Sequence, residues 1–258
     1  IRAGERLSPA KLGLLASVGV TEFKVIRKPV VAFFSTGDEL KGVGQTLQPG
    51  DIYDSNRYIL FGMLQKMGVD CIDMGVVPDI REEIEATLKQ AADIADMVIT
   101  SGGASVGEAD FIKLILDEIG EVGFWKIAMK PGKPLAFGHI NTTVFFGLPG
   151  NPVSAMATFY QFVQPSLHLL QGETLSEPLR LRAKTLGKLK KRPGRKDFQR
   201  GILSNNEQGE LVVDTTGIQG SHMLSSMAMA NCFIVLERDA GNIEAGEMVE
   251  VQPFNELI

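Results

Sequence analysis

The sequence predicts an α/β domain followed by a small all-β domain. Between residues 28 and 172, apolar runs typical of buried parallel strands alternate with amphipathic helical segments. After residue 172 the pattern changes to short alternating runs separated by turn residues, which indicates β structure. The boundaries that we predict are 1–27 for a lone helix and linker, 28–172 for the α/β domain and 176–258 for the β domain.

The sequence carries local signals for the first helix and for the elements of the α/β domain. Ser8 and Pro9 predict the start of the first helix, and Gly19 is suited to its end. Asp79 and Glu82 have the spacing of a capping box at the start of a later helix. We expect strands at 30–34, 69–74, 97–99 and 122–129, a hairpin of 135–138 with 143–146, and helices at 55–67, 79–92, 111–116 and 152–170.

Composition excludes several classes of function. The net charge of −5 gives no nucleic-acid footprint, and no apolar run is long enough to span a bilayer. We therefore expect a cytoplasmic protein. Cys71 and Cys232 lie far apart and are expected to be free thiols, and the three histidines lack the spacing of a zinc site.

The stretch of residues 100–111 organises the α/β domain. Its strand is followed by Gly102, Gly103 and Ser105, and then by an amphipathic helix. Glycines allow backbone N–H groups to converge, and a helix N-terminus favours anions, so this turn suits a phosphate. Taken alone, it is equally well a structural glycine-rich turn.

Several other turns should join this one. In a domain of parallel strands, the turns that follow the strands lie at one edge of the sheet, where ligands bind. Glu39, Asp79 and Asp110 lie in such turns, and their oxygens suit Mg²⁺. Lys130 and Lys133 lie in a loop that two prolines stiffen, and they suit an oxyanion. Each feature also has a plain alternative, such as a helix cap for Asp79 or solvated loops for the lysines, and the joint pattern favours a binding site.

Two polar clusters punctuate the β domain, at residues 192–200 and 220–226. The plain interpretation is surface charge and an ordinary turn. The sharper interpretation is that one arginine and one serine face the α/β edge and complete an anion pocket.

Five motifs in this order resemble the molybdopterin molybdenumtransferases, which are the bacterial MoeA proteins and the E domain of gephyrin. The resemblance covers nearly the whole chain. The motifs are residues 35–40 (STGDEL), 101–110 (SGGASVGEAD), 130–134 (KPGKP), 147–154 (GLPGNPVS) and 193–200 (PGRKDFQR).

The resemblance implies a fold, an activity and a set of site residues. The α/β domain is expected to be a three-layer α/β/α, MogA-like, molybdopterin-binding domain. Members insert molybdenum from molybdate into adenylylated molybdopterin and release AMP, with Mg²⁺ as the cation. The implied catalytic residues are Glu39, Asp79, Asp110, Lys126 and Lys130, of which the three acids form the metal site. Substrate binding falls on Thr36, Gly102, Gly103, Ser105, Pro149, Asn151 and Pro152, and molybdate binding on Lys130, Lys133, Pro134, Ser154, Arg195 and Ser226.

The resemblance also implies partners and alternatives. A homodimer is expected, as is contact with MogA-like and other molybdenum-cofactor biosynthesis proteins. Members carry a longer N-terminal segment, of which only the tail is expected here, as residues 1–25. Two alternative functions remain: a MogA-like adenylyltransferase, which would lack the β domain, and a gephyrin-type dimeric scaffold that binds ligands or peptides.

Overall fold

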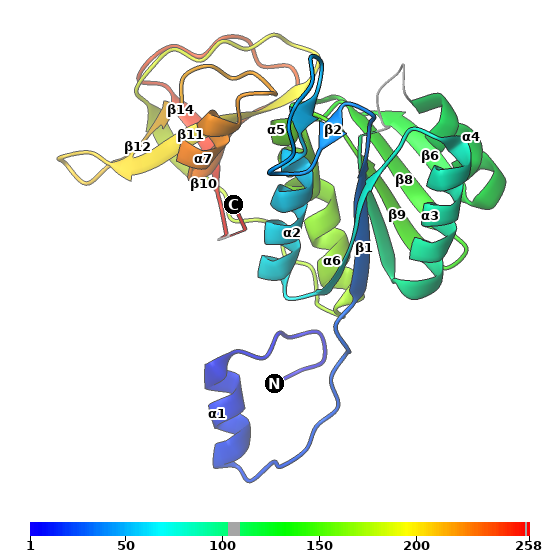
Figure 1. Ribbon diagram of the computed structural model, residues 1–258. Coiled ribbons are helices and arrows are strands. Elements are labelled where there is room, and N and C mark those ends of the chain that lie inside the picture. The colour runs from blue at the N-terminus through cyan, green and yellow to red at the C-terminus, as the bar shows by residue number, and fades with distance from the viewer. Residues whose placement is uncertain (103–108, 256) are drawn as a thin grey trace.

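The computed structural model of the chain describes residues 1–102, 109–255 and 257–258. Figure 1 shows an α/β domain, a β domain beside it, and an N-terminal helix apart from both. The main sheet has the strand order β4-β1-β5-β9-β8-β6. Its strands are β1 (Val30–Thr36), β4 (Asp70–Val77), β5 (Met97–Ser101), β6 (Glu121–Lys126), β8 (Pro134–Ile140) and β9 (Thr143–Leu148).

Strands β4, β1, β5 and β9 are parallel, whereas β8 runs antiparallel to both β9 and β6. The central strands β1 and β5 are buried almost throughout, as their continuous apolar runs predict. The predicted hairpin is confirmed, and Asn141 turns it with a positive φ of 54°.

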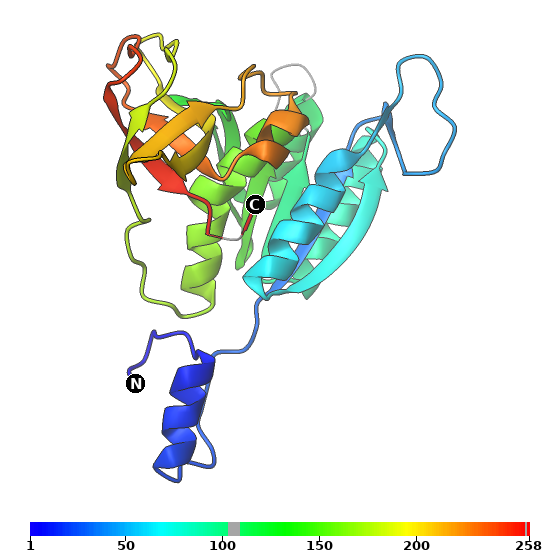
Figure 2. The same cartoon turned by 90° about the vertical axis from the view of Figure 1, so that its left-hand side faces the viewer.

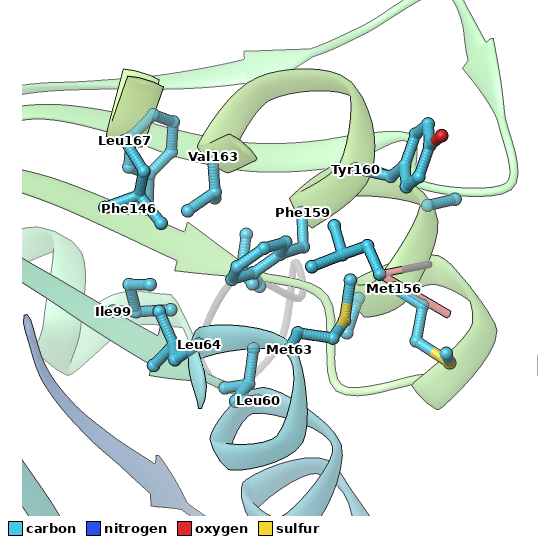
Figure 3. Packing of buried hydrophobic residues seen from close by; sticks show 14 of the residues in the cluster. Leu60, Met63, Leu64, Ile99, Phe146, Met156, Phe159, Tyr160, Val163 and Leu167 are labelled. Carbon is cyan, nitrogen blue, oxygen red and sulfur yellow. The ribbon is translucent and has the colours of Figure 1, made fainter. Parts of the chain in front are cut away.

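Helices cover both faces of this sheet, so the predicted three-layer arrangement is confirmed (Figure 1). On one face the apolar cluster includes Leu60, Leu64 and Phe159, and Figure 3 shows Leu60 and Leu64 pointing toward the Phe159 ring. This face carries α2 (Ser55–Met67), α5 (Pro152–Thr158), the π-helical turn η1 (Phe159–Val163) and α6 (Gln164–Leu170). The other face carries α3 (Arg81–Ile94) and α4 (Ala109–Ile119).

The β domain closes on itself, because β12 pairs with both β10 and β11. Two of its elements were not predicted. One is the short helix α7, which the otherwise β-barrel-like domain carries between β12 and β13. The other is β7, which comes from the α/β domain and joins the second sheet beside β11. The elements are β7 (Met129–Lys130), β10 (Leu181–Thr185), β11 (Lys196–Asn205), β12 (Leu211–Thr215), α7 (Leu224–Met229), β13 (Cys232–Leu236) and β14 (Met248–Pro253).

The predicted start of the first helix is confirmed, whereas the predicted cap of α3 is wrong. Helix α1 (Pro9–Ser17) begins after Ser8, whose Oγ accepts a hydrogen bond from the Lys11 N–H. The predicted capping box is wrong, because α3 has Ile80 as its N-cap and no side-chain cap bond. The helix from residue 152 to 170 is continuous but contains η1. Pro165 has no N–H for an α-helical bond, and the Gln164 N–H donates to the Phe159 carbonyl instead.

The loop after β1 also holds two short strands that were not predicted, β2 (Leu40–Lys41) and β3 (Ile52–Tyr53). Within the described residues, no helix is both long and apolar enough to cross a membrane. Cys71 and Cys232 are free, as expected.

The linker that follows α1 is fastened to the sheet by a single acid. Arg27 pairs with the Asp96 carboxylate through both terminal guanidinium nitrogens, and the Val30 N–H donates to Asp96 Oδ2 at 2.8 Å. The hydrogen bonds from Arg27, followed by the one from Val30, lower the pKa of Asp96. Figure 2 shows the linker running into β1, with α1 apart from the two domains.

We expect Asp96→Ala to lower the free energy of unfolding by about 1 kcal/mol at pH 7, because the N–H that begins β1 loses its acceptor. The folded-state pKa of Asp96 is lowered, so its contribution is present above the unfolded value of about 3.9 and is lost as the pH falls below it. Urea unfolding at pH 7 and pH 2.5 measures both effects. The exposed acid variant Asp93→Ala is the control, and an equal loss in both variants contradicts the prediction.

Candidate functional site

Four parallel strands end side by side and bring their turns together. Thr36 at the end of β1 lies opposite Val77 of β4, and Ser101 of β5 lies opposite both Ser35 and Leu148. The turns at 37–39, 78–79, 102 and 149–151 therefore adjoin along one edge, as the sequence predicts.

Hydrogen bonds connect these turns to one another. The Asp79 N–H donates to Asp38 Oδ1 at 3.1 Å, and the Gly102 N–H donates to the Leu148 carbonyl at 3.3 Å. Gly102 has a φ of +92°, and a Cβ at this position would lie 2.6 Å from the Thr36 carbonyl oxygen. Only glycine permits this approach, and the predicted role of Gly102 in binding a phosphate stays a prediction.

The loop from 127 to 133 lies at the same edge because β6 ends where β8 begins, with Lys126 opposite Pro134. Its strand β7 pairs with β11, and Lys130 Nζ lies 3.3 Å from Asp197 Oδ2. Gly132 packs closely against α5, since a Cβ there would lie 2.5 Å from Thr158 Oγ1. The two predicted lysines of this loop therefore lie where the two domains meet.

A loop of the β domain reaches the start of α5. The Val153 N–H donates to the Ser221 carbonyl at 3.2 Å. Arg200, only 1% exposed, lies beneath this loop and donates to the carbonyls of Ile218 and Gly220 at 3.3 and 3.0 Å. Burial lowers the pKa of Arg200. The Arg200 guanidinium thus fixes the conformation of the loop through these hydrogen bonds.

The structure groups most of the predicted site residues. Those along the strand ends are Thr36, Glu39, Asp79, Gly102, Pro149, Asn151 and Pro152, and those around the loop before β8 and the start of α5 are Lys126, Lys130, Lys133, Pro134 and Ser154. Gly103 and Ser105 lie outside the described residues, as does the side chain of Asp110.

Two predicted molybdate residues are placed less favourably. Arg195 is exposed at the start of β11. Ser226 is buried, and its hydroxyl accepts from Arg200 Nε at 3.1 Å and donates to the Met223 carbonyl at 2.7 Å. Both assignments stay predictions. Ser221 is the β-domain serine whose backbone contacts α5.

Mg²⁺ fits only part of the predicted acid set within the described residues. There, no group of three or more Asp, Glu, His or Cys side chains is arranged to hold a metal. Glu39 and Asp79 do lie on adjacent turns. Because Mg²⁺ in nucleotide sites commonly uses one or two carboxylates besides water and phosphate oxygens, this pair suits the ion.

Sequence reasoning missed the polar residues at the start of α2. Asp54 is 2% exposed and caps the helix through Oδ1, whereas its Oδ2 has no hydrogen-bond partner in the described chain. Asn56, Ser35 and Thr100 also have unpaired buried side-chain oxygens at this edge. A polar cluster directly after a glycine- and proline-rich loop was the available signal.

A cavity of about 460 Å³ lies elsewhere. It is lined by η1 and α6, the linker at 173–179 and the end of β14, and by none of the predicted site residues. The candidate site at the strand ends therefore rests on side-chain chemistry and on the contacts between the turns.

Comparison with known proteins shows which family the chain belongs to. Residues 32–169, more than half of the chain, match the family model described as "Probable molybdopterin binding domain". The chain belongs to this family. Residues 182–254 also match "MoeA C-terminal region (domain IV)", so this member is of the MoeA type.

Individual relatives extend over the whole chain. A molybdopterin molybdenumtransferase of Haemophilus influenzae is 51% identical over 100% of this chain and 64% of its own length. Gephyrin of Dictyostelium discoideum is 33% identical over 99% of this chain and 41% of its own. A MoeA crystal structure from Pyrococcus horikoshii superposes with a TM-score of 0.83 at 33% identity, covering 99% of this chain and 62% of that one. The MoeA-type chain thus spans under two thirds of the length of these relatives.

We expect Gly102→Ala to destabilise the protein by about 3 kcal/mol, since the methyl group adds a clash with Thr36 to the strain of a positive φ. Gly209→Ala is the matched control, because Gly209 has a φ of +79° and open space around it. The control variant measures only the strain of alanine at a positive φ, which costs about 1 kcal/mol. Guanidinium unfolding measures both, and equal losses contradict the close approach.

We expect Arg200→Met to cost about 3 kcal/mol, because the loop carbonyls lose a charged donor that is itself buried. Arg195→Met removes an exposed arginine near the start of the same strand and should change stability by less than about 0.5 kcal/mol. Thermal or chemical unfolding of the two variants measures the loss of stability in each. Similar small losses show that Arg200 does not hold the loop.

Proposed function

We propose that this chain inserts molybdenum into adenylylated molybdopterin and releases AMP, forming molybdenum cofactor. The observation that supports this most is the junction of two elements at one edge. A glycine turn suited to phosphate adjoins a lysine loop suited to molybdate, and the β domain closes against that loop through β7 and β11. The Haemophilus influenzae relative bears the name of this activity.

The chain's own residues have positioning roles in this proposal. Gly102 and the turn at 149–152 receive the phosphate and pterin part of the substrate. Lys130 and Lys133 attract molybdate and hold it beside the phosphoanhydride and the dithiolene, with Ser154 of α5 beneath them. Lys130 also faces Asp197, which fixes its ammonium near the domain junction.

Glu39 and Asp79, with Asp110 from the sequence prediction, would hold Mg²⁺, which polarises the phosphoanhydride when bound. Homodimeric assembly, cytoplasmic location and exchange of substrate with a MogA-like adenylyltransferase complete the proposal. An adenylyltransferase function for this chain is disfavoured, since the β domain matches the MoeA C-terminal region.

The decisive experiment is molybdate-triggered, Mg²⁺-dependent release of AMP from adenylylated molybdopterin by this chain. Release supports the transferase. The longer Haemophilus influenzae relative is the positive control. Absence of release from this chain, when the relative does release AMP, contradicts the activity for residues 1–258 taken alone.

We expect Lys133→Ala to raise the KM for molybdate about tenfold, because one hydrogen bond to a charged group is lost. Binding of the pterin nucleotide should stay within about twofold, because the lysine lies on the molybdate side of the proposed site. Lys66→Ala removes an exposed lysine of α2 and is the control. Equal weakening of both ligands contradicts the assignment of Lys133.

A further inference from the structure

Asn56 lies at the start of α2 and bridges two turns of the candidate site. It is 7% exposed, and its Nδ2 donates to Ser101 Oγ at 2.8 Å and to the Gly150 carbonyl at 2.6 Å. The first partner ends β5, and the second lies between β9 and α5. Both hydrogens of one amide group therefore connect three separate elements.

The connected turns are those of the proposed substrate site. Gly150 approaches Gly102 closely, since a Cβ on Gly150 would lie 3.9 Å from the Gly102 Cα. The Gly102 N–H also donates to Leu148, directly before the second turn. Asn56 thus braces this pair of turns from the α2 side, and its two bonds fix how far apart they lie.

A purely structural role explains Asn56 poorly. Its Oδ1 is buried and has no hydrogen-bond partner among the described residues. An unpaired buried amide oxygen costs stability. Costs of this kind are typical of functional sites.

We propose that Asn56 is a positioning residue, which sets the separation between the turn at Gly102 and the turn at 149–152 and thereby the fit of the pterin nucleotide. This inference rests on the proposed function. Asn151, at the tip of the second turn, is exposed and makes no side-chain cap bond to α5, so its amide is available to a ligand. Asn56 holds the backbone that presents it.

The test is Asn56→Asp, which keeps the shape but replaces both donors with an oxygen that repels the Gly150 carbonyl. We expect the KM for adenylylated molybdopterin to rise about tenfold, with kcat within about threefold, because the change acts on binding geometry. Hydrogen exchange should become faster at 150–158, where the Val153 N–H depends on the turn, and stay unchanged at 55–67. Asn205→Asp, at the exposed end of β11, is the matched control.

An unchanged KM overturns the proposal. Faster exchange across 55–67 as well as 150–158 also overturns it, because Asn56 would then only stabilise α2. If Asn56→Asp does not fold, Ser101→Ala removes one acceptor and should raise the same KM about threefold. If the wild-type chain releases no AMP, the proposed function fails, and the exchange comparison still decides whether Asn56 holds the turn.

Discussion

The parallel alignment of β4, β1, β5 and β9 is the constraint on which the rest of the site depends. It makes four strands end together, and the near-contact of Gly102 with the Thr36 carbonyl brings the turns of β5 and β1 within van der Waals distance. A side chain at residue 102 would force these turns apart. The turn at Gly102, the turns of β1 and β4 and the start of α5 lie together at one edge because these turns pack so closely.

The second constraint is the attachment of the β domain. Strand β7 leaves the α/β domain to pair with β11, and the loop at 218–223 returns to α5 through Ser221. The buried Arg200 donates hydrogen bonds to carbonyls of that loop and so stiffens it. Burial also lowers the pKa of Arg200. The lysine loop before β8 is therefore held from both sides, which suits a site that must orient an anion against a second substrate.

The sequence allowed the architecture to be predicted because each α/β signal is local. The apolar runs of β1 and β5, the hairpin at Asn141 and the Ser8 cap all depend on neighbours within a few residues. The failures concern contacts distant in sequence. The Asp79 N–H is used by Asp38 of another turn, so the helix begins at Arg81 without the expected cap. Arg200 and Asn56 carried no periodic signal, because their partners lie 18 to 94 residues away.

The two-sided construction of the site bears on which reaction the fold suits. The glycine turns of an α/β domain alone are enough to hold a phosphorylated pterin. A second anion needs its own donors, and the loop proposed to supply them pairs with β11 of the β domain through β7 and through Lys130 and Asp197. Removal of the β domain would leave Lys130 without Asp197 and α5 without Ser221. The β domain is thus part of the proposed site, and the proposed reaction of two anionic substrates would use both domains.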